Sequence, residues 1–353
     1  MKLFWKITII YCCFGFTCLV HSQENSAVKI DFSGYVDLYY LYNFNQPTAL
    51  ESVPFLYNYN RHNEFNSNIS LFRTKVSYQN YYANIALQSG TYVESNYANE
   101  KIKYLNEAFI GVFLDAEKKN ILEVGILPSY IGFESATTSA NITLTRSILA
   151  ENSPYFMAGV KLNRLISKKV SLAGIVSNGW QKINKPNRKA LPSFGAQLVY
   201  KPSEKSTLNW STFIGDEPIE DNLRTRYFSN LFWDYKWSPK WHTITGFDIG
   251  YQKKQSENNF SNWYSPVFIT QYELNKKWQT ALRLEYYQDK EAVLIGSKQT
   301  LGTSINFDYL PNPKVKFRCE AKYYNANEPF FMRNNQLVRG NFIITTSLSF
   351  EFL

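Results

Sequence analysis

The sequence predicts an all-β fold, an antiparallel β-barrel that crosses a membrane with about 16 strands. Three observations predict it. Polar and apolar residues alternate with period two from Val28 to the end of the chain. Aromatic residues are abundant, with 26 Tyr, 26 Phe and 8 Trp among 353 residues, although the mean hydropathy is −0.33. Short connections rich in Pro, Asn, Ser and Lys alternate with longer polar ones.

The first 22 residues have the layout of a secretory signal peptide. Lys2 and Lys6 precede an apolar run at 7–20, and a Val-His-Ser tripeptide ends at Ser22, after which we expect cleavage. No segment approaches the roughly 18 consecutive apolar residues that a membrane helix requires. We therefore expect residues 23–353 to form a single domain that crosses an outer membrane with strands.

Cysteine and charge usage narrow the class of protein. Cys319 is the only cysteine after the predicted leader, so residues 23–353 cannot close an internal disulfide or build a cysteine metal site. A lipoprotein anchored through Cys18 is less favoured, because Thr17 is a poor fit to the small residue wanted before it. The leader carries two lysines, so the formal charge falls from +9 to +7. This excess suits an anionic membrane surface or an anion-preferring lumen, and export argues against a nucleic-acid partner.

The first strand illustrates the alternation. Between Val28 and Tyr40, apolar side chains interleave with Lys29, Asp31 and Asp37, so one face is apolar and the other is charged. The corresponding runs lie at 28–43, 66–78, 81–91, 104–115, 120–127, 155–165, 169–180, 192–201, 205–215, 224–237, 240–252, 262–273, 276–287, 298–310, 314–325 and 338–353. An even number of strands, with short periplasmic turns and longer extracellular loops, predicts a closed barrel in which every backbone group finds a partner.

The outward-facing aromatic residues of this register form two belts, as expected where a barrel meets the two interfaces of a bilayer. The belt at the short-turn end contains Tyr78, Tyr200, Trp237, Trp241, Trp278, Tyr309 and Phe352. The belt at the long-loop end contains Tyr40, Tyr227, Tyr251, Tyr264, Tyr286 and Tyr323. A soluble β-sandwich or propeller also alternates, but it does not need such belts.

Three short motifs resemble the OmpL-like β-barrel porins of Gram-negative outer membranes. They are GILPSYIGFE (125–134), NSPYFMAGV (152–160) and SNGW (177–180), and the resemblance covers the chain from about Phe32 to Leu353. It implies a water-filled channel for passive diffusion of small hydrophilic solutes or ions. The terminal SFEFL (349–353) is similar to the signal that the barrel assembly machinery reads, although Leu353 departs from the usual aromatic end and Phe352 stands in for it.

Charged residues on the inward face are the candidate functional residues, because charge inside a pore sets ion selectivity. The predicted pore-lining basic residues are Lys29, Arg73, Lys75, Arg283, Lys316, Arg318 and Lys322. The predicted pore-lining acidic residues are Asp31, Asp37, Glu285, Glu320 and Glu351. The basic residues could form a wall that draws anions in, or the acidic residues of the same arc could neutralise them in ladder pairs. Both alternatives stay open.

The connection at 128–154 is a candidate constriction loop. By resemblance to known porins it could fold inward and narrow the pore with Glu134, Arg146 and Glu151. The alternative is that Pro128 and Gly132 only turn the chain outward and that the loop lies flat outside.

Two other functions compete with a passive channel. An enzymatic barrel would need a nucleophile beside a base, and neither His62 nor His242 lies in a Ser or Asp motif, so we predict no enzyme, no catalytic or metal-binding residue and no cofactor. A surface-exposed binding or adhesion protein would use the barrel only as an anchor. The predicted partners are outer-membrane lipid, lipopolysaccharide, the barrel assembly machinery and small hydrophilic solutes, and a homotrimer is an open alternative to a monomer.

Overall fold

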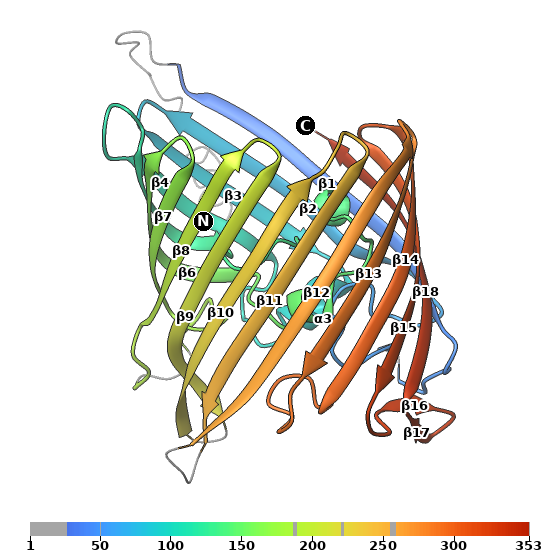
Figure 1. The fold of residues 1–353 in the computed structure, drawn as a ribbon. Coiled ribbons are helices and arrows are strands. Elements are labelled where there is room, and N and C mark those ends of the chain that lie inside the picture. Colours follow the sequence, from blue (N-terminus) through green and yellow to red (C-terminus); the bar gives the residue numbers. More distant parts are fainter. Residues whose placement is uncertain (1–26, 50, 186–188, 220–221, 255–258, 353) are drawn as a thin grey trace, which may run out of the picture.

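Sixteen antiparallel strands close into one barrel in the computed structural model (Figure 1). The structure describes residues 27–49, 51–185, 189–219, 222–254 and 259–352. The predicted signal peptide at 1–22 lies outside the described residues. The barrel confirms the predicted fold class, because its strands follow one another around the wall in sequence order and the last pairs with the first.

The barrel strands coincide with the sixteen predicted runs to within a few residues. They are β1 (Lys29–Asn43), β2 (Phe65–Tyr78), β3 (Tyr81–Ser89), β4 (Leu105–Phe113), β5 (Asn120–Pro128), β6 (Phe156–Ser167), β7 (Val170–Ser177), β8 (Ser193–Ser203), β9 (Ser206–Ile219), β10 (Asn222–Lys236), β11 (Trp241–Lys253), β12 (Phe260–Asn275), β13 (Trp278–Gln288), β14 (Gln299–Asn312), β15 (Val315–Ala326) and β18 (Gly340–Phe352). The connections carry helix α2 (Thr91–Asn96), the 3-10 helix η1 (Thr138–Ala140), helix α3 (Ile148–Glu151) and a hairpin of β16 (Phe331–Arg333) and β17 (Gln336–Val338).

One strand pair is longer than the sequence pattern predicts. β9 continues to Ile219 rather than ending near residue 215, and its extension pairs with the start of β10 through Asp216↔Thr225 and Glu217↔Arg224. Residues 216–219 are largely polar, so the sequence pattern assigns them to a loop. A hairpin that extends beyond lipid needs backbone pairing but no apolar face, so its sequence carries no membrane signature.

The wall has the inside and the outside that the alternation predicts. On β13, Leu284 is 57% exposed whereas its neighbour Arg283 is fully buried. Outward-facing Trp237, Trp241 and Trp278 are likewise exposed at the short-turn end, as predicted for one aromatic belt. Large apolar side chains outside and charged side chains inside reverse the arrangement of a soluble protein. No helix of the described chain is long and apolar enough to cross a bilayer.

Closure of the barrel places its first and last strands, β1 and β18, side by side. Gly34 of β1 pairs with Phe352 of β18, and a Cβ at Gly34 would lie 2.1 Å from the Phe352 ring. The ring therefore lies over the glycine on the outer face. This contact seals the seam at the short-turn end, where the C-terminus lies in Figure 1.

Candidate functional site in the barrel interior

The connection between β5 and β6 runs through the barrel. We call residues 129–155 the inner loop. Leu144, Arg146 and Ile148 of this segment are completely buried, and α3 contacts β12 and β13 from within the ring of strands (Figure 1). Local capping helps to form α3, because the Ser147 hydroxyl accepts a hydrogen bond from the Ala150 amide at 3.2 Å.

Basic side chains of β13 and β15 hold the inner loop against one side of the wall. Arg283 donates to the Thr143 hydroxyl at 2.9 Å and to the Thr145 carbonyl at 2.6 Å. Lys322 donates to the Arg146 carbonyl at 3.1 Å. We call the inward face of β13, β14, β15, β18 and β1 the docking arc.

The same arrangement continues farther along β15. Arg318 donates to the Thr138 carbonyl at 2.8 Å and to the Ile142 carbonyl at 3.0 Å, and Lys316 donates to the Ser139 carbonyl at 2.7 Å. Buried carbonyl groups need donors, and these cations supply them where water is excluded.

Acidic side chains of the docking arc bind the loop as well. Glu320 accepts hydrogen bonds from both the amide and the hydroxyl of Thr145, at 2.6 and 2.8 Å. Glu285 accepts one from the Ile148 amide at 2.7 Å. Asp37 on β1 accepts hydrogen bonds from Thr138 at 3.4 Å and from the Tyr59 hydroxyl of the first loop.

Ion pairs within the arc balance its charge. Glu320 lies 2.6 Å from Arg283, and Glu285 lies 2.8 Å from Lys322. Arg318 pairs with Asp308 at 2.8 Å. The cations of the docking arc therefore pair with acids of their own arc and also bind the inner loop. The loop contributes mainly carbonyl and hydroxyl oxygens rather than carboxylates.

The three charged residues proposed for a constriction are all buried. Arg146 pairs with Glu151 at 2.8 Å, and Glu151 also accepts the Tyr57 amide of the first loop at 3.0 Å. Glu134 accepts hydrogen bonds from the amide and the hydroxyl of Ser147, and its carboxylate lies 3.7 Å from Arg283. These charges tie the loop to itself, to the first loop and to the wall.

Burial shifts the protonation of Glu134. Its pKa lies above the ordinary value because the carboxyl is removed from water. Arg283 and the hydrogen bonds from Ser147 oppose this shift, and the nearby Glu285 adds to it.

Five predicted pore-lining residues make no hydrogen bond or ion pair to the inner loop within the described chain. Lys29 and Asp31 form an exposed pair at 2.9 Å near the short-turn end. Glu351 is exposed at the same end, and the Lys75 ammonium lies 4.9 Å from the centre of the Tyr82 ring. Arg73 pairs with Glu107 of β4 at 2.7 Å, on the opposite side of the inner loop.

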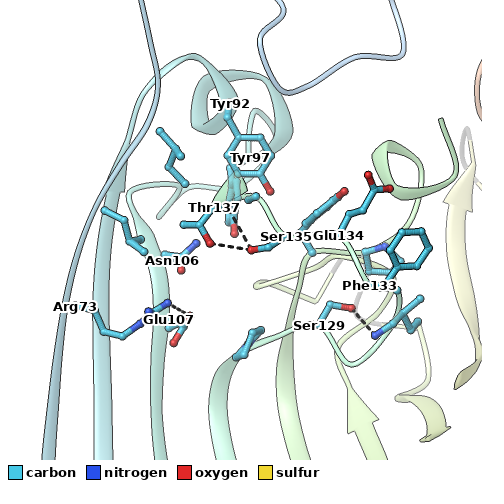
Figure 2. A pocket seen from close by; sticks show the side chains of 18 residues that line it. Arg73, Tyr92, Tyr97, Asn106, Glu107, Ser129, Phe133, Glu134, Ser135 and Thr137 are labelled. Carbon is cyan, nitrogen blue, oxygen red and sulfur yellow. Dashed lines mark hydrogen bonds and ion pairs between the residues drawn. The ribbon is translucent and has the colours of Figure 1, made fainter. Parts of the chain in front are cut away.

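A cavity of about 250 Å³, which we call the inner cavity, lies between the inner loop and strands β2 and β4. Figure 2 shows Arg73 and Glu107 on its wall, facing Ser129, Ser135 and other residues of the loop. The Arg73 Nε and the Tyr155 hydroxyl, both at this cavity, have no hydrogen-bond partner among the described residues. The residues that line the inner cavity thus include two with buried polar atoms that have no hydrogen-bond partner among the described residues.

A second cavity of about 200 Å³, the outer cavity, lies among the long connections. Ser153 lines the outer cavity and Pro154 lines the inner one, so the two linings include neighbouring residues at the end of the inner loop. Arg146, Tyr155 and Tyr92, which we call the partition, connect the two linings, because Arg146 pairs with Glu151 of the outer cavity and Tyr155 and Tyr92 line the inner one. The Arg146 guanidinium lies 3.5 Å from the centre of the Tyr155 ring and 5.1 Å from that of Tyr92.

Sequence reasoning missed several of these residues. Asp308 and Glu107 follow the alternation on β14 and β4, so the inward pattern could have identified them. Tyr155 and Tyr92 lie in or beside connections, where no periodicity predicts burial. Their positions depend on how two loops fold into the same interior.

The two histidines named above have local partners. His242 on β11 lies 2.7 Å from Asp234, and the His62 ring accepts the Asn43 amide at 3.0 Å. In the described ranges no group of three His, Cys, Asp or Glu residues is arranged to hold a metal ion.

Several solved outer-membrane proteins have a similar fold. The outer membrane channel DcaP of Acinetobacter baumannii superposes with a TM-score of 0.64 at 9% identity, covering 95% of this chain and 100% of that one. The anion-selective porin from Comamonas acidovorans superposes with a TM-score of 0.63 at 7% identity, covering 92% of this chain and 100% of that one. A trimer form of OmpT from Vibrio cholerae superposes with a TM-score of 0.62 at 8% identity, also covering 92% of this chain and 100% of that one. At these identities the likeness concerns the fold.

Sequence comparison identifies the family. No curated protein matches the chain. The family described as beta-barrel porin-2, OmpL-like, matches residues 29–352, which is the whole barrel. The chain therefore belongs to the OmpL-like beta-barrel porin-2 family and is an outer-membrane protein of the porin class rather than a member of an enzyme family.

Proposed function

We propose that this porin forms a water-filled channel for passive diffusion of small hydrophilic solutes, and that the inner loop narrows the path to the side away from the docking arc. One observation carries the proposal. The docking arc is covered by the loop, whereas the inner cavity is lined by β2 and β4, the outer cavity by β9 and β10, and the two linings include the neighbouring loop residues Pro154 and Ser153. A solute would pass from the outer cavity through the partition of Arg146, Tyr155 and Tyr92 into the inner cavity.

Conductance in a planar bilayer tests this proposal. Purified full-length protein should give stepwise conductance. Absence of steps from a correctly folded barrel would contradict the channel and favour a surface-binding protein that uses the barrel as an anchor. Lipid or peptide hydrolysis that disappears in His242→Ala would instead favour an enzyme.

We also propose a modest preference for anions. Fewer basic residues account for this preference than the sequence pattern indicates. Lys316, Arg318 and Lys322 bind the inner loop, so they contribute less to the field in the open path. Arg73 and Lys75 remain on the uncovered side, and we assign the preference to them. The reversal potential in a salt gradient should indicate anion preference and should shift towards cations in Arg73→Ser.

We also propose that the protein assembles as a homotrimer through the outer face of β1, β2, β15 and β18. A groove of about 810 Å³ crosses this face beside Phe317. Its floor includes Ser67, whose hydroxyl lies 3.1 Å from that of Ser70, and Thr346, whose hydroxyl donates to the Tyr40 carbonyl at 3.4 Å. Hydroxyl groups and a hollow suit contact with a second copy better than contact with lipid tails.

The oligomeric state in mild detergent tests this assembly. Light scattering should give three protein masses per particle, and Thr346→Trp should reduce that number by filling the groove. A monomeric wild type would overturn the trimer and leave the channel proposal untouched. Lipid, lipopolysaccharide and the barrel assembly machinery remain the other partners that we propose, based on the apolar outer face and the terminal Phe352.

A further inference from the structure

The outer cavity combines residues from distant parts of the chain. Tyr57 comes from the first loop, Glu151 from the inner loop and Trp180 from the connection after β7. Glu217 and Arg226 enter from the wall, on β9 and β10. A cavity lined by several loops at the long-loop mouth is where an entering solute would first be held.

Arg226 is a buried cation whose hydrogen-bonding capacity is largely unused. It is 5% exposed, and its Nε donates to Gln252 at 2.9 Å. The closest carboxylate, that of Glu217, lies 4.0 Å from Nη1, which is longer than a hydrogen bond. A guanidinium has five N–H donors, and no other hydrogen bond from this one occurs within the described chain. Its terminal nitrogens are therefore available at the cavity.

The carboxylates around the outer cavity are occupied by other donors. Glu100 accepts the amides of Ile183 and Asn184, and Glu151 accepts Arg146 at 2.8 Å. Glu217 accepts the Trp180 amide at 3.1 Å. None of them makes a hydrogen bond to Arg226, and Glu217 is its ion-pair partner only at 4.0 Å, so no carboxylate of the described chain forms a close, hydrogen-bonded pair with this buried cation.

The aromatic surroundings hold Arg226 in place. The Arg226 guanidinium carbon lies 5.0 Å from the centre of the Trp180 ring. Trp180 is fixed by edge contacts to Phe213 and Phe228, with ring centres 5.1 and 4.8 Å apart. A preorganised cation loses little entropy when it binds an anion. Lys182, at the same cavity, adds a second positive charge.

We infer that the outer cavity is a binding site for small organic carboxylates, which Arg226 holds through a bidentate pair with Lys182 as a second cation. The planar fork of a guanidinium matches a carboxylate. A single negative charge suits the site better than two, because Glu100, Glu151 and Glu217 would repel a dianion such as hydrogen phosphate more strongly than a monoanion. This inference rests on the proposed channel and names the class of solute that the channel would bind at its mouth.

Calorimetric titration of the full-length protein in detergent tests the site, with lactate as the probe. Lactate should bind the wild type, whereas glucose should not and phosphate should bind more weakly. Arg226→Gln should weaken lactate binding by about tenfold or more, as expected for loss of a charge-assisted bidentate pair. Arg226→Lys should give an intermediate affinity, and Lys205→Gln, at an exposed turn, should leave it unchanged.

The outcomes separate this inference from the channel proposal. Stepwise conductance without lactate binding, or with equal binding by wild type and a folded Arg226→Gln, would overturn the site and leave the channel in place. Phosphate binding as tight as lactate would overturn the assignment to carboxylates. Absence of conductance together with Arg226-dependent lactate binding would overturn the channel and keep the site. If Arg226→Gln does not fold, Arg226→Lys and Lys182→Gln provide the same comparison.

Discussion

Arg283 and Arg73 face the same interior from two sides of the barrel, yet their environments differ. Arg283 is completely buried between the wall and the inner loop and lies beside Glu134, Glu285 and Glu320. The Arg73 side chain is 37% exposed at the inner cavity and pairs with one carboxylate. The first acts as an attachment point for the loop, and the second lines the space that the loop leaves open. An inward position alone therefore does not make a charged residue part of the pore.

The largest expected effect is on stability, from Arg283→Met. This change leaves Glu320 without its cation in a buried site, and breaking such a pair costs about 3–5 kcal/mol. Arg73→Met should cost less than Arg283→Met, because the Arg73 side chain is 37% exposed and the buried Glu107 keeps a hydrogen bond from Asn84. Urea unfolding followed by tryptophan fluorescence measures both. An equal loss of unfolding free energy in the two variants would contradict the distinction between the docking arc and the open side.

The second-largest expected effect is on the single-channel conductance of Tyr155→Ala. The side chain forms part of the partition between the two cavities, and its removal should widen the path and raise the single-channel conductance. Tyr78→Ala, on the lipid-facing side, is the matched control and should not change it. An unchanged conductance in Tyr155→Ala would mean that solutes take another route.

A smaller effect is expected from pH through Glu134. Its pKa is raised in the docked loop, so docking takes up a proton and becomes more favourable as the pH falls through that raised pKa. The gain is complete below the ordinary pKa of 4.5. Acidification should therefore reduce conductance by favouring the docked loop, and Glu134→Gln should remove the part of the pH dependence that is due to this residue. A wild-type conductance that rises on acidification would contradict the assigned sign.

The smallest expected effect is on selectivity. Arg73→Ser removes one charge from the open side and should shift the reversal potential by a few millivolts towards cations, since one charge in a wide, screened lumen acts weakly. Arg318→Ser should shift the reversal potential less, because the inner loop covers Arg318, whereas both arginines pair with a carboxylate. A larger shift of the reversal potential in Arg318→Ser than in Arg73→Ser would contradict this account, because the open path would then lie beside the docking arc.

The sequence predicts the wall better than the interior. Period-two alternation identifies which side chains of each strand point inward, as Arg283 and Leu284 illustrate, because lipid and the enclosed space impose opposite requirements on neighbouring residues. The path of residues 129–155 has no such signal. Thr138, Thr145 and Arg146 are buried through contacts with strands far along the chain, and their sequence is compatible with an exposed loop.

The outer cavity illustrates the same limit. Arg226 alternates like any inward-facing residue, but its unused donors depend on the position of Glu217, 4.0 Å away, and on the packing of Trp180. Neither is encoded locally, since these residues come from different strands and connections.

Charged thiol-reactive labelling during conductance recording tests the division of the interior most directly. In a Cys319→Ser background, Arg73→Cys should react with a water-soluble methanethiosulfonate and lose current. Thr345→Cys, buried on the docking arc, should stay unreactive, as should the lipid-facing Leu284→Cys. Rapid reaction at Thr345→Cys with loss of current, together with an inert Arg73→Cys, would show that the path lies where we place the loop.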